Sequence, residues 1–201
     1  MRSYPPPLPE VRRALSFSLP EHGTKPDQLC FWRGRLAELS EGAPWGALTL
    51  LAGLILQTQQ SGEQTAWIAA GDSVFYPPDL VWRGVDLAAV TVVWAPAPGT
   101  ALQAADWLLR SGAFGLVVID GLAERAADAE LARLGRLAED ADTAAVFLTS
   151  RRDSEPALGT QVPLRVAVRP SAGGAEAAVL KDKRGATGRS VWRRHGPMGL
   201  Y

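Results

Sequence analysis

The stretch that decides the fold is Leu108–Asp120, which reads LLRSGAFGLVVID. Its second half, Gly115–Asp120, is the most apolar strand-like run of the chain and ends in an acidic residue. A helix is predicted immediately before it, over Thr100–Ser111. This helix-to-strand unit predicts one repeat of an alternating α/β arrangement, in which a buried strand follows each helix.

The same alternation extends in both directions from this unit. Further strands are predicted at Arg35–Leu39, Gln64–Ala70, Val90–Trp94 and Ala144–Thr149, and further helices at Gly46–Gln60, Pro77–Gly84 and Ala123–Asp140. After residue 150 the helices stop, and three strands joined by turns are predicted at Val162–Val168, Ala175–Lys181 and Ser190–Arg194. Alternation followed by a β-meander predicts a mostly parallel twisted sheet flanked by helices, with antiparallel strands at its C-terminal edge.

Length and composition predict one soluble domain. The chain has 201 residues, of which 47% are hydrophobic and 21% charged, an ordinary globular balance. Prolines at positions 5, 6, 7 and 9 favour an extended arm over residues 1–30, and residues 31–201 form the expected core. The proline-rich start lacks the apolar segment of a signal peptide, and no apolar run approaches the length of a membrane span. Together with a single cysteine, Cys30, these features predict a cytoplasmic protein without a disulfide.

Charge is unevenly distributed, although the net charge is zero. Residues 1–150 carry 11 basic and 17 acidic side chains, whereas residues 151–201 carry 10 basic and 4 acidic side chains. A basic region of this kind favours a polyanion or an acidic partner. The alternative is that the basic residues only solvate the exposed edge of a hairpin.

Four strings resemble the core of the RecA recombinases. They are Gly34–Leu39 (GRLAEL), the opening LLRSGAFGLVVID, Val146–Ser150 (VFLTS) and Lys181–Gly185 (KDKRG). The resemblance covers residues 33–195, and the short length and late basic strands look most like the ImuA proteins. These are RecA-like accessory subunits of bacterial translesion-mutagenesis cassettes. The resemblance implies a RecA-like fold with a role in DNA damage tolerance and SOS mutagenesis.

The phosphate loop that this family would require is degraded. A working loop has the form GxxxxGK[ST], in which the lysine neutralises phosphate oxygens and the hydroxyl binds magnesium. The corresponding residues 41–49 read EGAPWGALT. Gly46 retains the second glycine, but Ala47 stands in place of the lysine and Leu48 in place of the hydroxyl residue.

Other changes in this loop act in the same direction. Glu41 replaces the first glycine with a negative charge, Pro44 removes a backbone donor, and Trp45 fills space. We therefore expect the vestigial loop (Glu41, Gly42, Pro44, Trp45, Gly46, Ala47, Leu48 and Thr49) to bind no ATP, and the protein to be no enzyme and to need no cofactor.

The catalytic positions that the resemblance implies are also depleted. Gly71 stands where the family carries a water-activating acid, and the neighbouring Asp72 is a candidate general base or a cap of the turn at Ser73. Asp120 matches the acidic end of the Walker B strand, and without the loop we interpret it as a vestige that caps the strand end. Ser150 stands in place of a γ-phosphate-sensing glutamine.

Histidines and tryptophans are the other residue types that could carry chemistry or contacts. The two histidines, His22 and His195, lie at opposite ends of the chain, so a metal site with Cys30 is not predicted. Tryptophans at 67, 94 and 107 lie in apolar patterns and are predicted to be core, whereas those at 45, 82 and 192 are predicted to be partly exposed and available for contacts.

Basic residues in the last quarter are the candidate DNA or partner contacts. In RecA the loop after the strand that matches Ala144–Thr149 touches DNA, and here that loop begins with two arginines, which suit phosphate contacts. In RecA-like assemblies a lysine pair on the late hairpin reaches a neighbouring subunit's nucleotide. The candidates are Arg151, Arg152, Lys181, Lys183, Arg184, Arg189, Arg193 and Arg194.

Three functions remain open at this stage. The first is a non-catalytic accessory protein that binds RecA or an ImuB-like Y-family polymerase homologue and inhibits recombination. The second is a protein that binds single-stranded DNA directly through the basic C-terminal region. The third is a residual NTPase that uses Thr49, Asp72 and Asp120.

Overall fold

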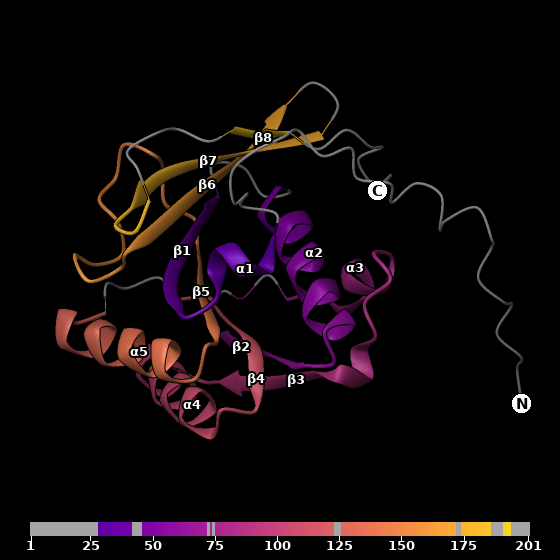
Figure 1. The fold of residues 1–201 in the computed structure, drawn as a ribbon, viewed down its shortest axis with the longest axis horizontal. Coiled ribbons are helices and arrows are strands. Elements are labelled where there is room, and N and C mark those ends of the chain that lie inside the picture. Colours follow the sequence, from indigo (N-terminus) through magenta and orange to yellow (C-terminus); the bar gives the residue numbers. More distant parts are fainter. Residues whose placement is uncertain are drawn as a thin grey trace, which may run out of the picture.

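A computed structural model describes residues 28–41, 46–71, 73, 75–122, 126–171, 174–185 and 191–193 (Figure 1). Within these residues, eight strands form one sheet in the order β3-β2-β4-β5-β1-β6-β7-β8. The strands are β1 (Arg35–Glu41), β2 (Gln64–Ala70), β3 (Val90–Ala95), β4 (Phe114–Asp120), β5 (Ala144–Thr149), β6 (Leu164–Ser171), β7 (Gly174–Asp182) and β8 (Val191–Arg193). The helices are α1 (Leu29–Trp32), α2 (Gly46–Gln60), α3 (Pro77–Val81), α4 (Pro98–Ser111) and α5 (Asp128–Asp140), with one 3-10 turn, η2 (Leu87–Ala89).

The pairing of the strands confirms the predicted fold class. Strands β3, β2, β4, β5, β1 and β6 are paired in parallel, and β7 and β8 are added antiparallel beside β6. The molecule therefore has a RecA-like α/β fold with an antiparallel C-terminal edge. Because the carboxyl ends of parallel strands meet at one edge, the ends of β1, β2, β4 and β5 define the edge where α/β proteins place their ligands.

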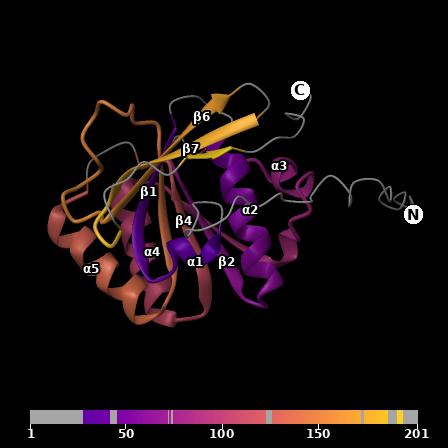
Figure 2. The same ribbon diagram turned by 45° about the horizontal axis from the view of Figure 1, so that its top comes forward.

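Helices cover both faces of this sheet. Helices α1, α2 and α3 contribute to one hydrophobic core, together with Trp67 and Leu39 of the sheet. Helices α4 and α5 contribute to a second core on the opposite face, together with Ile68 and Phe147. Figure 2 shows the two layers on either side of the strands. The dense apolar composition of α2 explains its position, since nearly all of its faces are covered.

Helix ends account for the differences from the predicted bounds. Helix α4 begins at Pro98, a residue favoured in a first helical turn, and ends at Gly112 with φ +63°. Helix α5 begins at Asp128, where Glu130 Oε2 accepts a hydrogen bond from Ala127 N at 3.2 Å. The predicted start at Ala123 was therefore early, and residues 123–125 lie outside the described residues. Helix α3 ends at Val81, before the predicted Gly84.

The start of the described chain is tied to the core. Leu29 and Trp32 of α1 are buried, and Leu29 N donates to Gln57 Oε1 of α2 at 3.0 Å. Residues 1–27 of the predicted arm lie outside the described residues. The packed region thus already includes Leu29, which belongs to the first core.

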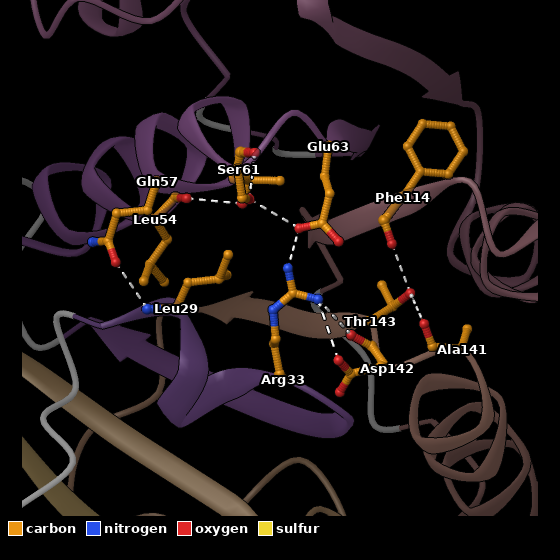
Figure 3. Close-up of polar contacts among 11 residues, drawn as sticks. Leu29, Arg33, Leu54, Gln57, Ser61, Glu63, Phe114, Ala141, Asp142 and Thr143 are labelled. Atoms are coloured by element: carbon orange, nitrogen blue, oxygen red, sulfur yellow. Dashed lines mark hydrogen bonds and ion pairs between the residues drawn. The ribbon is translucent and has the colours of Figure 1, made fainter.

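Arg33 then fastens the chain to the amino edge of the sheet (Figure 3). Its guanidinium forms an ion pair with Glu63 at the start of β2, and its Nη1 lies 3.3 Å from both the carbonyl and the carboxylate of Asp142, just before β5. Ser61 Oγ also donates to Glu63 Oε2, at 3.0 Å. Three elements that are distant in sequence are therefore joined where β1 begins.

The exposure of the tryptophans corrects part of the sequence prediction. Trp67 is fully buried and Trp82 is 82% exposed, as predicted. Trp94 and Trp107 were predicted to be core, but they are 70% and 64% exposed. Trp94 lies on β3, which is the edge strand, and Trp107 lies on the solvent-facing side of α4. The side chains of Trp45 and Trp192 lie outside the described residues.

Among the described residues, no helix combines the length and the apolarity that crossing a membrane requires.

Candidate functional site

The described part of the vestigial loop forms the first turn of α2. Ala47 is fully buried, at the position where a phosphate-binding lysine would stand. Thr49 Oγ1 accepts a hydrogen bond from Arg83 Nη2 at 2.8 Å. Glu41 ends β1, and residues 42–45, which include Gly42, Pro44 and Trp45, lie outside the described residues.

The positively charged side chain of Arg83 lies at the first turn of α2. It follows α3 and is partly buried against Thr49. Burial lowers the pKa of its guanidinium, and the nearby carboxylate of Asp79 opposes that effect. The Thr49 hydroxyl, one of the residues assigned to a residual NTPase, is thus bound by a side chain of the protein.

Asp120 lies at the carboxyl end of β4 and is 2% exposed. Its Oδ2 atom accepts hydrogen bonds from Trp67 Nε1 at 3.2 Å and from Ser73 Oγ at 2.5 Å. Strand β2 lies beside β4, with Trp67 opposite Val118, which brings the indole to the carboxylate. Asp72 lies outside the described residues, so its predicted role stays a prediction.

The described residues at this edge differ from those with which a GxxxxGK[ST] loop holds a magnesium-bound nucleoside triphosphate. The lysine is absent from the sequence, the remaining hydroxyl is bound by Arg83, and Asp120 already accepts two side-chain donors. In the described segments, no three His, Cys, Asp or Glu side chains are grouped as a metal site. A pocket of about 400 Å³ at the ends of β2 and β3 has no cationic lining either. It is lined by Ala69, Gly71, Ser73, Trp94, Ala95 and Pro96.

The second candidate region is the arginine loop, which we define as residues 150–163 between β5 and β6. Ser150 and Arg152 are exposed, and Arg151 is partly exposed. Arg151 Nη1 lies 3.4 Å from the carbonyl of Pro156, a long contact. Within the described residues the Arg152 guanidinium has no partner, so a positive charge is available at the start of the loop.

Two buried charged residues that the sequence analysis did not select hold this loop. Glu38 of β1 is fully buried and accepts from Thr149 Oγ1 and from Leu158 N, at 2.9 and 2.8 Å. Arg165 of β6 is 4% exposed and donates to the carbonyls of Glu155 and Arg152, at 2.6 and 2.9 Å. A glutamate inside the apolar string RLAEL was the available signal, since a charge is rarely buried without a partner.

Lys181 of β7 and Lys183, which directly follows the strand, reach the same loop. Lys181 Nζ and Lys183 Nζ lie 3.3 and 3.1 Å from the carbonyl oxygen of Thr160. Burial, together with the adjacent charge of Lys183, lowers the pKa of Lys181. Asp128 at the start of α5 accepts from the backbone N and the hydroxyl of Thr160, at 3.2 and 2.7 Å. This lysine pair therefore adds positive charge beside the arginine loop.

Arg184, another predicted basic residue, does not join this group. Arg184 Nη2 donates to Glu139 Oε1 and to the carbonyl of Gly34, at 2.9 and 3.1 Å, at the amino edge of the sheet. Arg193 lies in β8, and its side chain is outside the description. Arg189 and Arg194 lie outside the described residues.

Fold and site together define a RecA-like α/β protein with an altered phosphate loop. Among characterised proteins, the chain is 35% identical to RecA of Corynebacterium diphtheriae and of Corynebacterium glutamicum over 102 residues, and to RecA of Leifsonia xyli over 100 residues. These alignments cover 50%, 50% and 49% of this chain but 27%, 27% and 28% of the relatives. The chain therefore spans about a quarter of the length of the RecA proteins it matches. No protein-family model matches the sequence.

Proposed function

We propose that this protein is a non-catalytic, RecA-like accessory protein in DNA damage tolerance. The observation that carries the proposal is that the chain's own donors bind the side chains left at the nucleotide edge. Arg83 binds Thr49, and Trp67 and Ser73 bind Asp120. A RecA-like core without a nucleotide site could still present RecA-like binding surfaces, but it would not be driven by ATP hydrolysis.

The similarity to RecA suggests what such a core acts on. A subunit that resembles RecA but does not use ATP is suited to dock on RecA and interrupt recombination, so that lesion bypass proceeds. In the finer form of the proposal, the protein is of the ImuA type and docks on RecA or on an ImuB-like Y-family polymerase homologue. It would act in the cytoplasm, at the nucleoid when DNA is damaged, as part of the SOS response.

The direct test is RecA strand exchange on single-stranded DNA with this protein titrated in. We expect inhibition near one protein per RecA subunit, together with recovery of RecA in a pull-down from the same samples. Inhibition without recovery of RecA would favour competition for DNA. Unchanged strand exchange, with no binding of RecA or of the polymerase homologue, would contradict the accessory role.

Nucleotide binding gives a separate prediction, which distinguishes the proposal from a residual NTPase. A fluorescent ATP analogue with magnesium is expected to show no saturable anisotropy change, because no lysine is present to neutralise phosphate oxygens. RecA at equal concentration is the positive control. Saturable binding that is lost in Asp120→Asn would instead support an NTPase that uses Thr49, Asp72 and Asp120.

A second candidate function is direct binding of single-stranded DNA by the arginine loop. The exposed Arg152 guanidinium and the neighbouring lysine pair favour it. For the double variant Arg151→Gln/Arg152→Gln, the slope of log affinity against log salt is expected to become shallower by about 1.4, since each phosphate contact on a single strand contributes about 0.7. Fluorescence anisotropy with labelled oligothymidylate measures this slope.

The matched control for this prediction is Arg136→Gln. Arg136 is an exposed arginine on α5, so its loss removes the same kind of charge away from the loop. We expect the slope for this variant to stay at the wild-type value. Equal effects of the loop and control substitutions would show that only net charge matters.

A further inference from the structure

We propose that the buried pair Glu38 and Arg165 is a positioning device that holds the arginine loop in the conformation that presents Arg151 and Arg152 to a phosphate backbone. This inference rests on the second candidate function, DNA binding by that loop. It assigns a role to two residues that touch no ligand themselves. The assignment depends on where the hydrogen bonds of the pair are directed.

The two residues are neighbours in the sheet. Glu38 and Arg165 are opposite each other in the parallel register of β1 and β6, and Arg165 Nε lies 3.8 Å from Glu38 Oε2. The β6–β7 register shifts between Arg165 and Val166. Irregularities of this kind redirect side chains, and here the shift lies at the residue that reaches the loop.

Within the described residues, the side-chain hydrogen bonds of the pair all go to the arginine loop or to Thr149, which directly precedes it. Arg165 donates to the carbonyls of Arg152 and Glu155, which turns the first part of the loop around the guanidinium. Glu38 accepts from Thr149 just before the loop and from the backbone of Leu158 in its second half. The pair therefore fixes the entry, the turn and the return of one segment.

Other contacts also hold the loop. Asp128, Lys181 and Lys183 bind Thr160 in its second half. In its first half, Arg169 of β6 forms an ion pair with Asp153. The loop contains 14 residues between Thr149 and Leu164 without regular secondary structure, longer than most connections in compact domains. Inside the loop, Glu155 N donates to Arg152 O and Val162 N donates to Gly159 O, at 3.0 and 3.3 Å. Leu158 and Val162 anchor the second half in the core beside α5. In the half that carries the arginines, Arg165 binds two backbone carbonyls, and the Arg169–Asp153 ion pair lies in the same half.

Stability alone does not explain a buried ion pair at this place. Replacing such a pair with apolar residues is often neutral or stabilising, because removing two charges from water costs as much as their attraction returns. However, the hydrogen bonds of the pair are directed at one loop. They therefore fix the conformation of the arginine loop before any ligand binds. Ordering a loop in advance strengthens binding, because the ordering entropy is not lost at the binding step.

The test measures the loop and its binding separately. The variants are Arg165→Met, which keeps the length but loses the donors, Arg165→Lys as the conservative replacement, and Arg136→Met as the exposed control. Hydrogen–deuterium exchange of peptides covering residues 150–163 reports loop order, and anisotropy with oligothymidylate reports affinity. For Arg165→Met we expect exchange in the loop to rise by at least about tenfold, with α4 and β4 unchanged.

Affinity for oligothymidylate is expected to fall by about tenfold in Arg165→Met, as the cost of ordering two released arginines predicts. Arg165→Lys is expected to recover part of both losses, since an ammonium can still donate to one of the carbonyls. Arg136→Met should leave loop exchange unchanged. Unchanged loop exchange in Arg165→Met, with affinity intact, would overturn the proposal.

A double variant keeps the test informative if Arg165→Met fails to fold because Glu38 is left as an unpaired buried charge. Glu38→Gln/Arg165→Met removes both charges and is expected to fold and still to show the faster loop exchange. Ordered loop peptides in the folded double variant would overturn the positioning role. Absence of oligothymidylate binding by the wild-type protein would instead refute the DNA-binding function on which the inference rests.

Discussion

Gly121→Ala is expected to destabilise the protein by about 3–5 kcal/mol, the sum of backbone strain and overpacking. Gly121 follows β4 directly and has φ +82°, a conformation that side chains disfavour. A Cβ atom there would overlap the carbonyl oxygen of Ala70 and lie 2.9 Å from Ser73 N. Both obstacles are backbone atoms, so a rotamer change cannot relieve the clash. Urea unfolding followed by tryptophan fluorescence measures the loss.

The matched control is Gly62→Ala. Gly62 has a similar φ of +79°, but a Cβ atom would meet nothing within 4 Å. This variant reports the strain alone, about 1–2 kcal/mol. Equal losses in the two variants would show that the ends of β2 and β4 are not held as closely as the structure has them. A larger loss in Gly121→Ala identifies close contact of these strand ends as the cause.

Trp67→Ala is expected to cost about 3–5 kcal/mol, the range for deleting a large aromatic side chain from a core. Trp67 is fully buried, and its ring lies 5.0 Å from that of Phe75 between centroids. The indole also donates to Asp120. The substitution therefore leaves a cavity and removes one of the donors to a buried carboxylate. Chemical denaturation measures the free energy of unfolding.

Two comparisons separate these contributions. Trp67→Phe keeps much of the ring but loses the N–H group, so its cost reports the bond to Asp120, about 1.5–3 kcal/mol for a charged acceptor. Trp107→Ala removes a tryptophan that is 64% exposed and is expected to change stability by at most about 0.5 kcal/mol. A loss in Trp107→Ala as large as that in Trp67→Ala would contradict the assigned core.

The fold was predictable because its apolar patterns are strong and local. The bounds of α2, β2 and β5 coincide with the predicted Gly46–Gln60, Gln64–Ala70 and Ala144–Thr149. The start of α5 was not predictable, because the residues before Asp128 are compatible with a helix and the cap at Glu130 decides the boundary. Local propensity finds an element more reliably than it finds its ends.

The exposed tryptophans show that an apolar sequence pattern does not determine which side chains are buried. An apolar run such as VTVVW indicates a strand, but it does not say whether that strand is central or at the edge of the sheet. The strand order places β3 at the edge, where Trp94 is open to solvent. The error on Trp107 has the same origin, because only the packing of α4 on the sheet shows which side faces out.

For the candidate site too, some features can be predicted from the sequence and others require the structure. The altered phosphate loop is a prediction that the sequence alone can make, because it compares adjacent residues with a known motif. The contacts Arg83–Thr49 and Glu38–Arg165 join residues far apart in the chain, and no local pattern links them. The basic residues were selected by charge alone, and their partners distinguish the lysines beside the loop from Arg184 at the opposite edge.

The donors that bind Thr49 and Asp120 have a consequence for control in the cell. Proteins gated by a nucleotide change state when the γ-phosphate is lost, so hydrolysis limits how long they act. Here Arg83, Trp67 and Ser73 belong to the chain and are never consumed or exchanged. If the proposed function holds, the activity of the protein is therefore set by its concentration and not by a cycle of nucleotide hydrolysis.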